Sequence, residues 1–172
     1  MPTAAPPQVA RTKDITLRFD GRRCIDSRHC VLEAPEVFQA DTKGMWLHPE
    51  ATSVEHCARV AHNCPSGAIT YERHDGGPQE APPATNVLRV RENGPYAVHA
   101  QIDLAGDTAL RATLCRCGQS RRKPYCDNSH RQAQFTATGE PAKCEAEPLP
   151  RARRALEHHP GRQRPAAVAG QC

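Results

Sequence analysis

The stretch CRCGQSRRKPYCDNSH, residues 115–130, places four potential metal ligands within sixteen residues. Cys115 and Cys117 are in C-x-C spacing, so an extended loop can turn both thiolates toward one iron atom. Cys126 and His130 are four residues apart and share one face of a helical turn, from which both can reach a second iron. A tetrahedral zinc ion accepts the same three-cysteine, one-histidine set, so the spacing alone leaves zinc as an alternative.

The residues between these ligands resemble the CDGSH iron–sulfur family, whose pattern is C-x-C-x2-S-x3-P-x-C-D-G-S-H. Besides the ligands, the chain matches this pattern at Ser120, Pro124, Asp127 and Ser129. It departs at Asn128, where the family has glycine. Asparagine is the best replacement for glycine in a left-handed backbone conformation, so we expect the turn to survive. The resemblance implies a [2Fe–2S] cluster, with the histidine as the more exposed ligand, held by Cys115, Cys117, Cys126 and His130.

A second group of cysteines lies earlier in the chain. Cys24 and Cys30 are separated by five residues, and Cys64-Pro65 follows a predicted helix. Ferredoxins use C-x2-C-x2-C with a distant Cys-Pro, and here Ser27 takes the middle position. Separate structural thiols and a zinc site are the alternatives from the residues alone.

The segments around this second group resemble a divergent monocluster ferredoxin family over about 55 residues. The resemblance implies that Cys24, Cys30 and Cys64 hold a cluster. Because Ser27 replaces a cysteine, both a [3Fe–4S] cluster and a [4Fe–4S] cluster with a non-cysteine fourth ligand stay open.

The remaining cysteines are less informative. Cys57 is predicted to pack in the core, because it shares the apolar face of a helix with Val54, Ala58 and Ala61. Asp26 and His29 are weaker candidates for a fourth ligand. Cys144 and Cys172 have no partner residues nearby and are given no role.

The composition agrees with metal-binding cysteines. Nine cysteines cannot form a complete disulfide framework, and the N-terminal stretch lacks the apolar region of a secretory signal. No stretch approaches about 18 apolar residues, so we expect a cytoplasmic protein with reduced thiols and no membrane partner. The net charge of +4 is not a dense basic stripe with interleaved aromatics, so no nucleic-acid partner is expected.

The chain divides into two expected units. Residues 1–13 are predicted to be disordered, 14–73 to form the ferredoxin-type domain, 74–86 a linker, 87–140 the CDGSH-type domain and 141–172 a disordered tail. Residues 14–74 carry seven basic and nine acidic side chains, a net charge of −2. Residues 87–140 carry eight basic and five acidic side chains, a net charge of +3. Opposite charges predict that the units fold separately and contact each other at least transiently, and that salt loosens this contact.

The expected fold class is α+β, a small ferredoxin-like βαβ domain followed by a β-rich domain. Alternating or continuous apolar patterns predict strands at 15–19, 68–72, 87–91 and 96–102. Thr52 and Glu55 form a capping box that opens a helix, and Pro65 ends it. Residues 93–95, Asn-Gly-Pro, predict a turn between the last two strands.

These features predict a one-electron carrier with two clusters that works between unidentified redox partners. Replacing a thiolate by the imidazole of His130 raises a cluster's potential and makes its binding depend on pH. A cluster donor to an apo-acceptor, or a redox or iron sensor, is the second hypothesis, and a zinc-stapled interaction module is the third. No acid/base pair of catalytic spacing is present, so no enzyme is expected, and a homodimer is possible.

Overall fold

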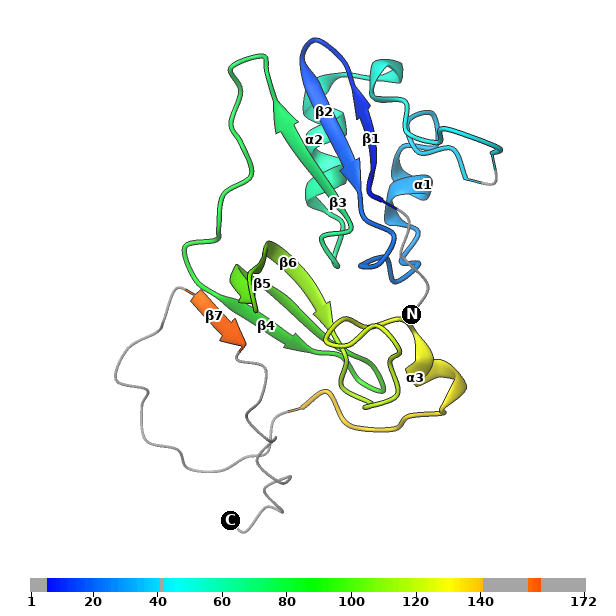
Figure 1. The fold of residues 1–172 in the computed structure, drawn as a ribbon, viewed down its shortest axis with the longest axis vertical. Helices are drawn as coiled ribbons and strands as arrows, with labels where there is room; N and C mark the ends of the chain where they lie inside the picture. The colour runs from blue at the N-terminus through cyan, green and yellow to red at the C-terminus, as the bar shows by residue number, and fades with distance from the viewer. Residues whose placement is uncertain (1–5, 41, 141–154, 159–172) are drawn as a thin grey trace.

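The computed structural model describes residues 6–40, 42–140 and 155–158, which form two α+β units joined along one side (Figure 1). The first unit has its strands and helices in the order β1 (Gln8–Arg11), β2 (Ile15–Phe19), α1 (His29–Glu33), η1 (Pro49–Ala51), α2 (Val54–His62) and β3 (Ile69–Arg73). The second unit has β4 (Val87–Val90), β5 (Tyr96–Leu104), β6 (Asp107–Leu114), α3 (Ser129–Gln132) and β7 (Ala155–His158). The expected α+β class is confirmed.

The sheet of the first unit is antiparallel in the order β1-β2-β3, and α2 packs on one of its faces (Figure 1). Ile15 pairs with Arg73 and Phe19 with Ile69 in the register of β2 and β3. Fully buried side chains from the strands, the helix and the intervening loop fill the core, among them Ile15, Leu17, Val37, Phe38, Leu47 and Val60. This core fixes the ends of β2 and α2, from which two cysteine loops emerge.

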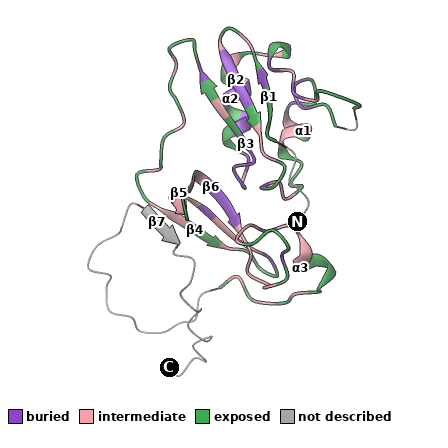
Figure 2. Cartoon of the chain, in the orientation of Figure 1, coloured by how far each residue is buried: buried purple, intermediate pink, exposed green. Residues whose placement is uncertain are grey.

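Helix α2 begins one residue later than the capping box predicts. Ser53 is the N-cap, because its Oγ accepts a hydrogen bond of 3.3 Å from the backbone N–H of His56. Glu55 does not reach back to the helix start, since its carboxylate binds Arg73 at 2.5 Å. On the predicted apolar face, Cys57, Ala58 and Ala61 are buried and Val54 is partly buried. Figure 2 shows buried segments in the strands of this unit and in α2.

The second unit is built on the antiparallel order β4-β5-β6, with a register shift in β5 between His99 and Ile102. Its buried apolar core is small and consists of Val98, Ala100, Ile102 and Ala112. A core of this size contributes little stability alone, so the unit depends on contacts with the first unit and on its ligand loop.

Two strands lie where disorder was expected. Residues 8–11 form β1, which pairs with β2 after a turn closed by the N–H of Thr12 and the carbonyl of Ile15 at 2.8 Å. Residues 155–158 form β7, which runs parallel to residues 101–104 of β5. Because β4 pairs with β5 only as far as His99, β7 occupies the edge that β4 leaves free. Residues 141–154 and 159–172, with Cys144 and Cys172, lie outside the described residues.

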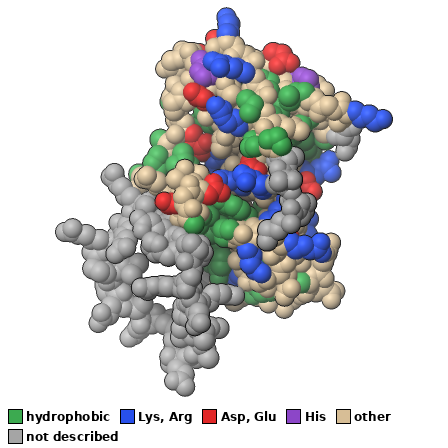
Figure 3. Space-filling model, in the orientation of Figure 1, with side chains coloured by type: hydrophobic (Ala, Val, Ile, Leu, Met, Phe, Trp, Pro, Cys, Tyr) green, Lys and Arg blue, Asp and Glu red, His purple; other side chains and the backbone are tan. Residues whose placement is uncertain are grey.

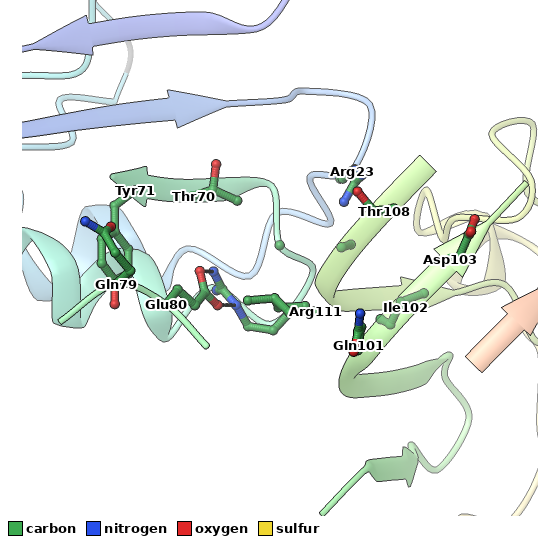
Figure 4. Close-up of a pocket in the computed structure, with 13 residues that line it drawn as sticks. Arg23, Thr70, Tyr71, Gln79, Glu80, Gln101, Ile102, Asp103, Thr108 and Arg111 are labelled. Carbon is green, nitrogen blue, oxygen red and sulfur yellow. Dashed lines mark hydrogen bonds and ion pairs between the residues drawn. The ribbon is translucent and has the colours of Figure 1, made fainter. Parts of the chain in front are cut away.

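The segment expected to be a linker is fixed to both units. The side-chain amide of Gln79 donates to the carbonyl of Arg73 at 2.7 Å, and its oxygen accepts from the N–H of Arg73 at 3.0 Å. Glu80 is buried where the units meet and pairs with Arg111 of β6 (Figure 4). Among the described residues, no helix combines the length and apolar character needed to cross a membrane.

Candidate iron–sulfur sites

The ligand loop of the second unit folds back on itself after β6. The N–H of Cys115 donates to the carbonyl of Pro124, and the N–H of Cys126 donates to the carbonyl of Thr113, both at 2.8 Å. The Ser120 hydroxyl, nearly buried, donates to the carbonyl of Tyr125 at 2.6 Å. These bonds bring the C-x-C pair and Cys126 to the same end of the loop.

The four predicted ligands of this loop form two close pairs. The Sγ atoms of Cys115 and Cys117 are 3.9 Å apart, and the Sγ of Cys126 is 3.5 Å from the Nδ1 of His130. Burial raises the pKa of the Cys126 thiol, and the nearby thiols of Cys115 and Cys117 add to this shift. Each pair has the spacing expected of two ligands on one iron atom, which fits a cluster with two irons.

Backbone amides point at the sulfur atoms of this loop. The N–H of Gln119 lies 3.4 Å from the Sγ of Cys117, and the N–H of Asn128 lies 3.4 Å from the Sγ of Cys126. Such bonds stabilise thiolate charge and raise the potential of a cluster that the thiolates hold.

The turn at Asn128 has the conformation expected from the sequence. Its φ of 68° and ψ of 6° are left-handed, so asparagine occupies the position where the family has glycine without changing the turn. The carboxylate of Asp127 accepts from the N–H groups of Ser129 and Arg121, each at 3.0 Å. The following helix, α3, has only four residues, so it adds little dipole to the site.

His130 is suited to act as a neutral ligand. Its side chain is partly exposed, whereas Cys126 is buried. Burial, followed by the positive charge of Arg131, lowers the pKa of the imidazole. The ring therefore stays neutral, and able to bind metal through Nδ1, to a lower pH than a free histidine.

The three predicted ligands of the first unit come from three elements. Cys24 lies in the loop after β2, Cys30 in α1 and Cys64 just after α2. Burial raises the pKa of Cys30 to about 11, with smaller contributions from the thiols of Cys64 and Cys24. Burial, and to a lesser extent the thiol of Cys64, also raises the pKa of Cys24. Cys24 and Cys30 also pack against the buried core to which Cys64 belongs.

The loop between the first two cysteines is tightly wound. Asp26 and Arg28 have positive φ values of 55° and 61°, and the N–H of Asp26 lies 3.5 Å from the Sγ of Cys24. The side chains of Asp26, Ser27 and His29 are exposed. Sequence reasoning missed Ser66, whose buried Oγ lies 3.6 Å from the Sγ of Cys64. The signal that could have identified Ser66 as part of the site is its position two residues after Cys64, in the sequence Cys-Pro-Ser.

Cys57 is placed apart from these ligands. It is fully buried in the core of the first unit, and its Sγ donates to the carbonyl of Pro49 at 3.5 Å. Burial, and then the charge of Glu36, raises its pKa to about 11. A thiol in this environment packs as a small apolar side chain.

Within the residues that the structure describes, no three or more His, Cys, Asp or Glu side chains lie close enough to hold a single metal ion. The predicted ligands instead form two close pairs in the second unit, and in the first unit they lie at one buried core.

Sequence reasoning also missed Arg111, which links the two sites. Its guanidinium Nη1 donates to the carbonyls of Ala61, His62 and Cys64 at 2.7, 2.8 and 2.5 Å. These carbonyls lie at the end of α2 and just after it, so an arginine from the second unit caps the helix that precedes Cys64. Gly67 allows this approach, because a Cβ there would collide with the carbonyl of Arg111.

Comparison with known families agrees with both sites. Residues 10–74 match the family model of a divergent 4Fe-4S mono-cluster, and residues 93–131 match that of an iron-binding zinc finger of the CDGSH type. No curated protein and no solved structure matches the chain. The molecule is therefore an iron–sulfur protein. It is a fusion of a divergent 4Fe-4S mono-cluster domain and a CDGSH domain, and each predicted ligand lies within the matched part of its own domain.

Proposed function

We propose that the protein is a one-electron carrier with two clusters and not an enzyme. The [2Fe–2S] cluster is held by Cys115, Cys117, Cys126 and His130, and a [4Fe–4S] or [3Fe–4S] cluster is held by Cys24, Cys30 and Cys64. The observation that carries the proposal is the pairing of the second ligand set, 3.9 Å between two sulfurs and 3.5 Å between sulfur and imidazole nitrogen. When bound, each cluster supplies a centre that takes up or releases one electron.

The residues of the chain tune this chemistry. Neutral His130 in place of a fourth thiolate leaves the second site less negative, and the amide groups that point at Cys117 and Cys126 act in the same direction. Both effects raise the potential of the second site relative to an all-cysteine site.

A basic surface next to the second site fits an acidic redox partner. Arg121, Arg122 and Lys123 are exposed on the ligand loop, and Arg131 is exposed on α3. The first two and Arg131 line a hollow with Asn128 and Asp26. Figure 3 shows Lys and Arg side chains on one face of the second unit and along its junction with the first. Such a surface increases the rate of association with an acidic partner and makes that rate depend on salt.

Anaerobic purification followed by iron and acid-labile sulfide analysis tests this proposal. We expect iron and sulfide for two clusters, an absorption spectrum that bleaches on reduction, and two distinct paramagnetic signals. Protein that contains zinc without iron and sulfide, even after anaerobic reconstitution, would contradict it.

A cluster donor is the second candidate, because His130 is a partly exposed ligand. Mixing the loaded protein with an apo-acceptor separates the two functions. A carrier returns to its oxidised spectrum with its iron retained, whereas a donor loses iron and sulfide to the acceptor. Retention of both over repeated cycles of reduction and oxidation supports the carrier.

A further inference from the structure

We propose that Asn128 and Thr113 couple the two iron–sulfur sites by joining the loops that hold their ligands, an inference that rests on the proposed function. Each side chain crosses from the second unit to a backbone carbonyl of the first. Each of those carbonyls belongs to the residue that directly follows a predicted ligand of the first site.

The first bridge is made by Asn128. Its Nδ2 donates to the carbonyl of Ile25 at 2.6 Å, and Ile25 follows Cys24. The backbone N–H of the same asparagine points at the Sγ of Cys126. A glycine at position 128, as in the family pattern, would keep the backbone contact and lose the bridge. The departure of this chain from the pattern therefore supplies one of the two contacts between the ligand loops.

The second bridge is made by Thr113. Its Oγ1 donates to the carbonyl of Pro65 at 3.3 Å, and Pro65 follows Cys64. The carbonyl of Thr113 accepts from the N–H of Cys126 at 2.8 Å. Thr113 is 2% exposed, so water does not compete for this bond. The bridges start beside two different ligands of the first site and both end at Cys126.

The surrounding interface holds both bridges in place. Arg111 donates to the carbonyl of Cys64, and Arg122 donates to the carbonyl of Gly21 at 3.0 Å. Arg23 lies over the ring of Tyr125, 5.1 Å from its centroid, and pairs with Asp107. Contacts on either side of the bridges keep the two ligand loops at a fixed separation.

The bridges form a short bonded route from one ligand set to the other. With both clusters bound, an electron that a one-electron donor delivers to one site would pass to the other. The site that gives the electron would be oxidised by one electron and the site that takes it reduced by one, with no proton transferred. Thr113 and Asn128 act as positioning residues that fix the separation and the path.

The test uses the full-length chain loaded with both clusters and three variants. Asn128→Gly restores the family residue at a φ that glycine adopts freely, Asn128→Asp keeps the shape but cannot donate, and Thr113→Val keeps the shape without a hydroxyl. The matched control is Asn93→Gly. Asn93 also has a positive φ, and its side chain accepts a hydrogen bond from Ala137, which does not belong to the interface.

Two measurements are made on each protein. We expect amide hydrogen exchange over residues 24–28 to become roughly tenfold faster in the Asn128 variants, because one hydrogen bond is lost, and to stay unchanged in Asn93→Gly. Rapid-freeze paramagnetic resonance after a substoichiometric pulse of dithionite follows the electron between the two sites. That transfer should slow severalfold in each of the three variants and not in the control.

Transfer at the wild-type rate in all three variants would overturn the coupling, whatever their exchange rates. A protein that contains only one cluster would instead overturn the proposed function. The exchange measurement would still test the bridge in that protein, where unchanged exchange in both Asn128 variants also overturns the inference.

Discussion

Arg111 and Glu80 form a two-pronged ion pair where the two units meet. The Nε of Arg111 is 2.7 Å from Oε1 of Glu80, and its Nη2 is 2.9 Å from Oε2. The side chains are only 5% and 7% exposed, and Figure 4 shows them against each other between β6 and the segment that joins the units. The same guanidinium caps α2, so one residue connects the joining segment, the helix end and the second sheet.

Arg111→Ala should destabilise the protein by about 3–5 kcal/mol, because it removes the cap at the end of α2 and leaves the buried carboxylate of Glu80 with only the longer contact of 3.7 Å to His62. Arg89→Ala is the matched control, since Arg89 is exposed on β4 and should cost less than about 0.5 kcal/mol. Chemical unfolding of both variants measures the difference. Similar stabilities for the two variants would show that the buried pair does not hold the interface.

Raising the ionic strength should leave the two units together. The opposite charges of the units predicted a contact that is at least transient and that salt would loosen. The structure shows a packed interface with Arg111 and Thr113 buried in it, which changes the effect expected of salt. Buried pairs are screened much less than exposed ones. Small-angle scattering should give the same radius of gyration in 0.1 M and 1 M salt, although the Debye length differs about threefold between them. Expansion at high salt would support the salt-sensitive contact predicted from the charges.

Gly67→Ala should open the interface beside Cys64. Gly67 has a φ of 66°, and a Cβ there would collide with the carbonyl of Arg111. Gly76→Ala is a matched control, because Gly76 has a φ of 83° and nothing within 4 Å of the added atom. Backbone strain of about 1–2 kcal/mol is common to both variants, so the extra loss in Gly67→Ala measures the close approach. If thermal unfolding shows an equal loss of stability in both variants, the interface accommodates the added Cβ at no cost in free energy.

The local parts of this molecule could be predicted from the sequence, and the contacts between its units could not. The Asn128 turn and the strand at 15–19 follow from spacing and alternation over a few residues. Arg111 was missed because its partners, Glu80 and the carbonyls at the end of α2, lie 31 to 50 residues away in sequence. Strand β1 was missed because a Pro/Ala-rich start hides four residues that pair only once β2 is formed.

The helix start shows a further limit of pattern reasoning. Thr52 and Ser53 are adjacent hydroxyl residues, and both are good N-caps. The capping box favoured Thr52, but Glu55 is drawn to Arg73, a residue of β3. A tertiary ion pair thus removes one half of the local motif, and Ser53 becomes the cap.

Cys57→Ala should retain the cluster of the first unit, whereas Cys24→Ala, Cys30→Ala and Cys64→Ala should each lose it. Cys57 packs in the core, so its replacement removes a buried atom and costs about 1 kcal/mol without touching the converging thiols. Iron content and the visible spectrum of the four variants measure retention, with circular dichroism as the control for folding. Loss of the cluster in a folded Cys57→Ala protein would make Cys57 a ligand.

His130→Cys should retain the second cluster, lower its potential and remove its sensitivity to acid. Burial and Arg131 hold the pKa of the His130 imidazole below its ordinary value. The wild-type ring is therefore a neutral ligand above that pKa, and the cluster becomes labile as the pH falls through it and the ring takes up a proton. A thiolate at position 130 adds negative charge, which lowers the potential, and its protonation does not follow the titration of an imidazole.

His29→Gln is the control, because His29 is exposed on α1 beside Cys30 and should leave the acid lability of the second cluster unchanged. The rate of cluster bleaching between pH 5 and pH 8, the range in which histidine changes charge, measures the effect in all three proteins. If His130→Cys loses its cluster with the same pH profile as the wild type, another group controls the lability, and His130 is not the ligand that titrates.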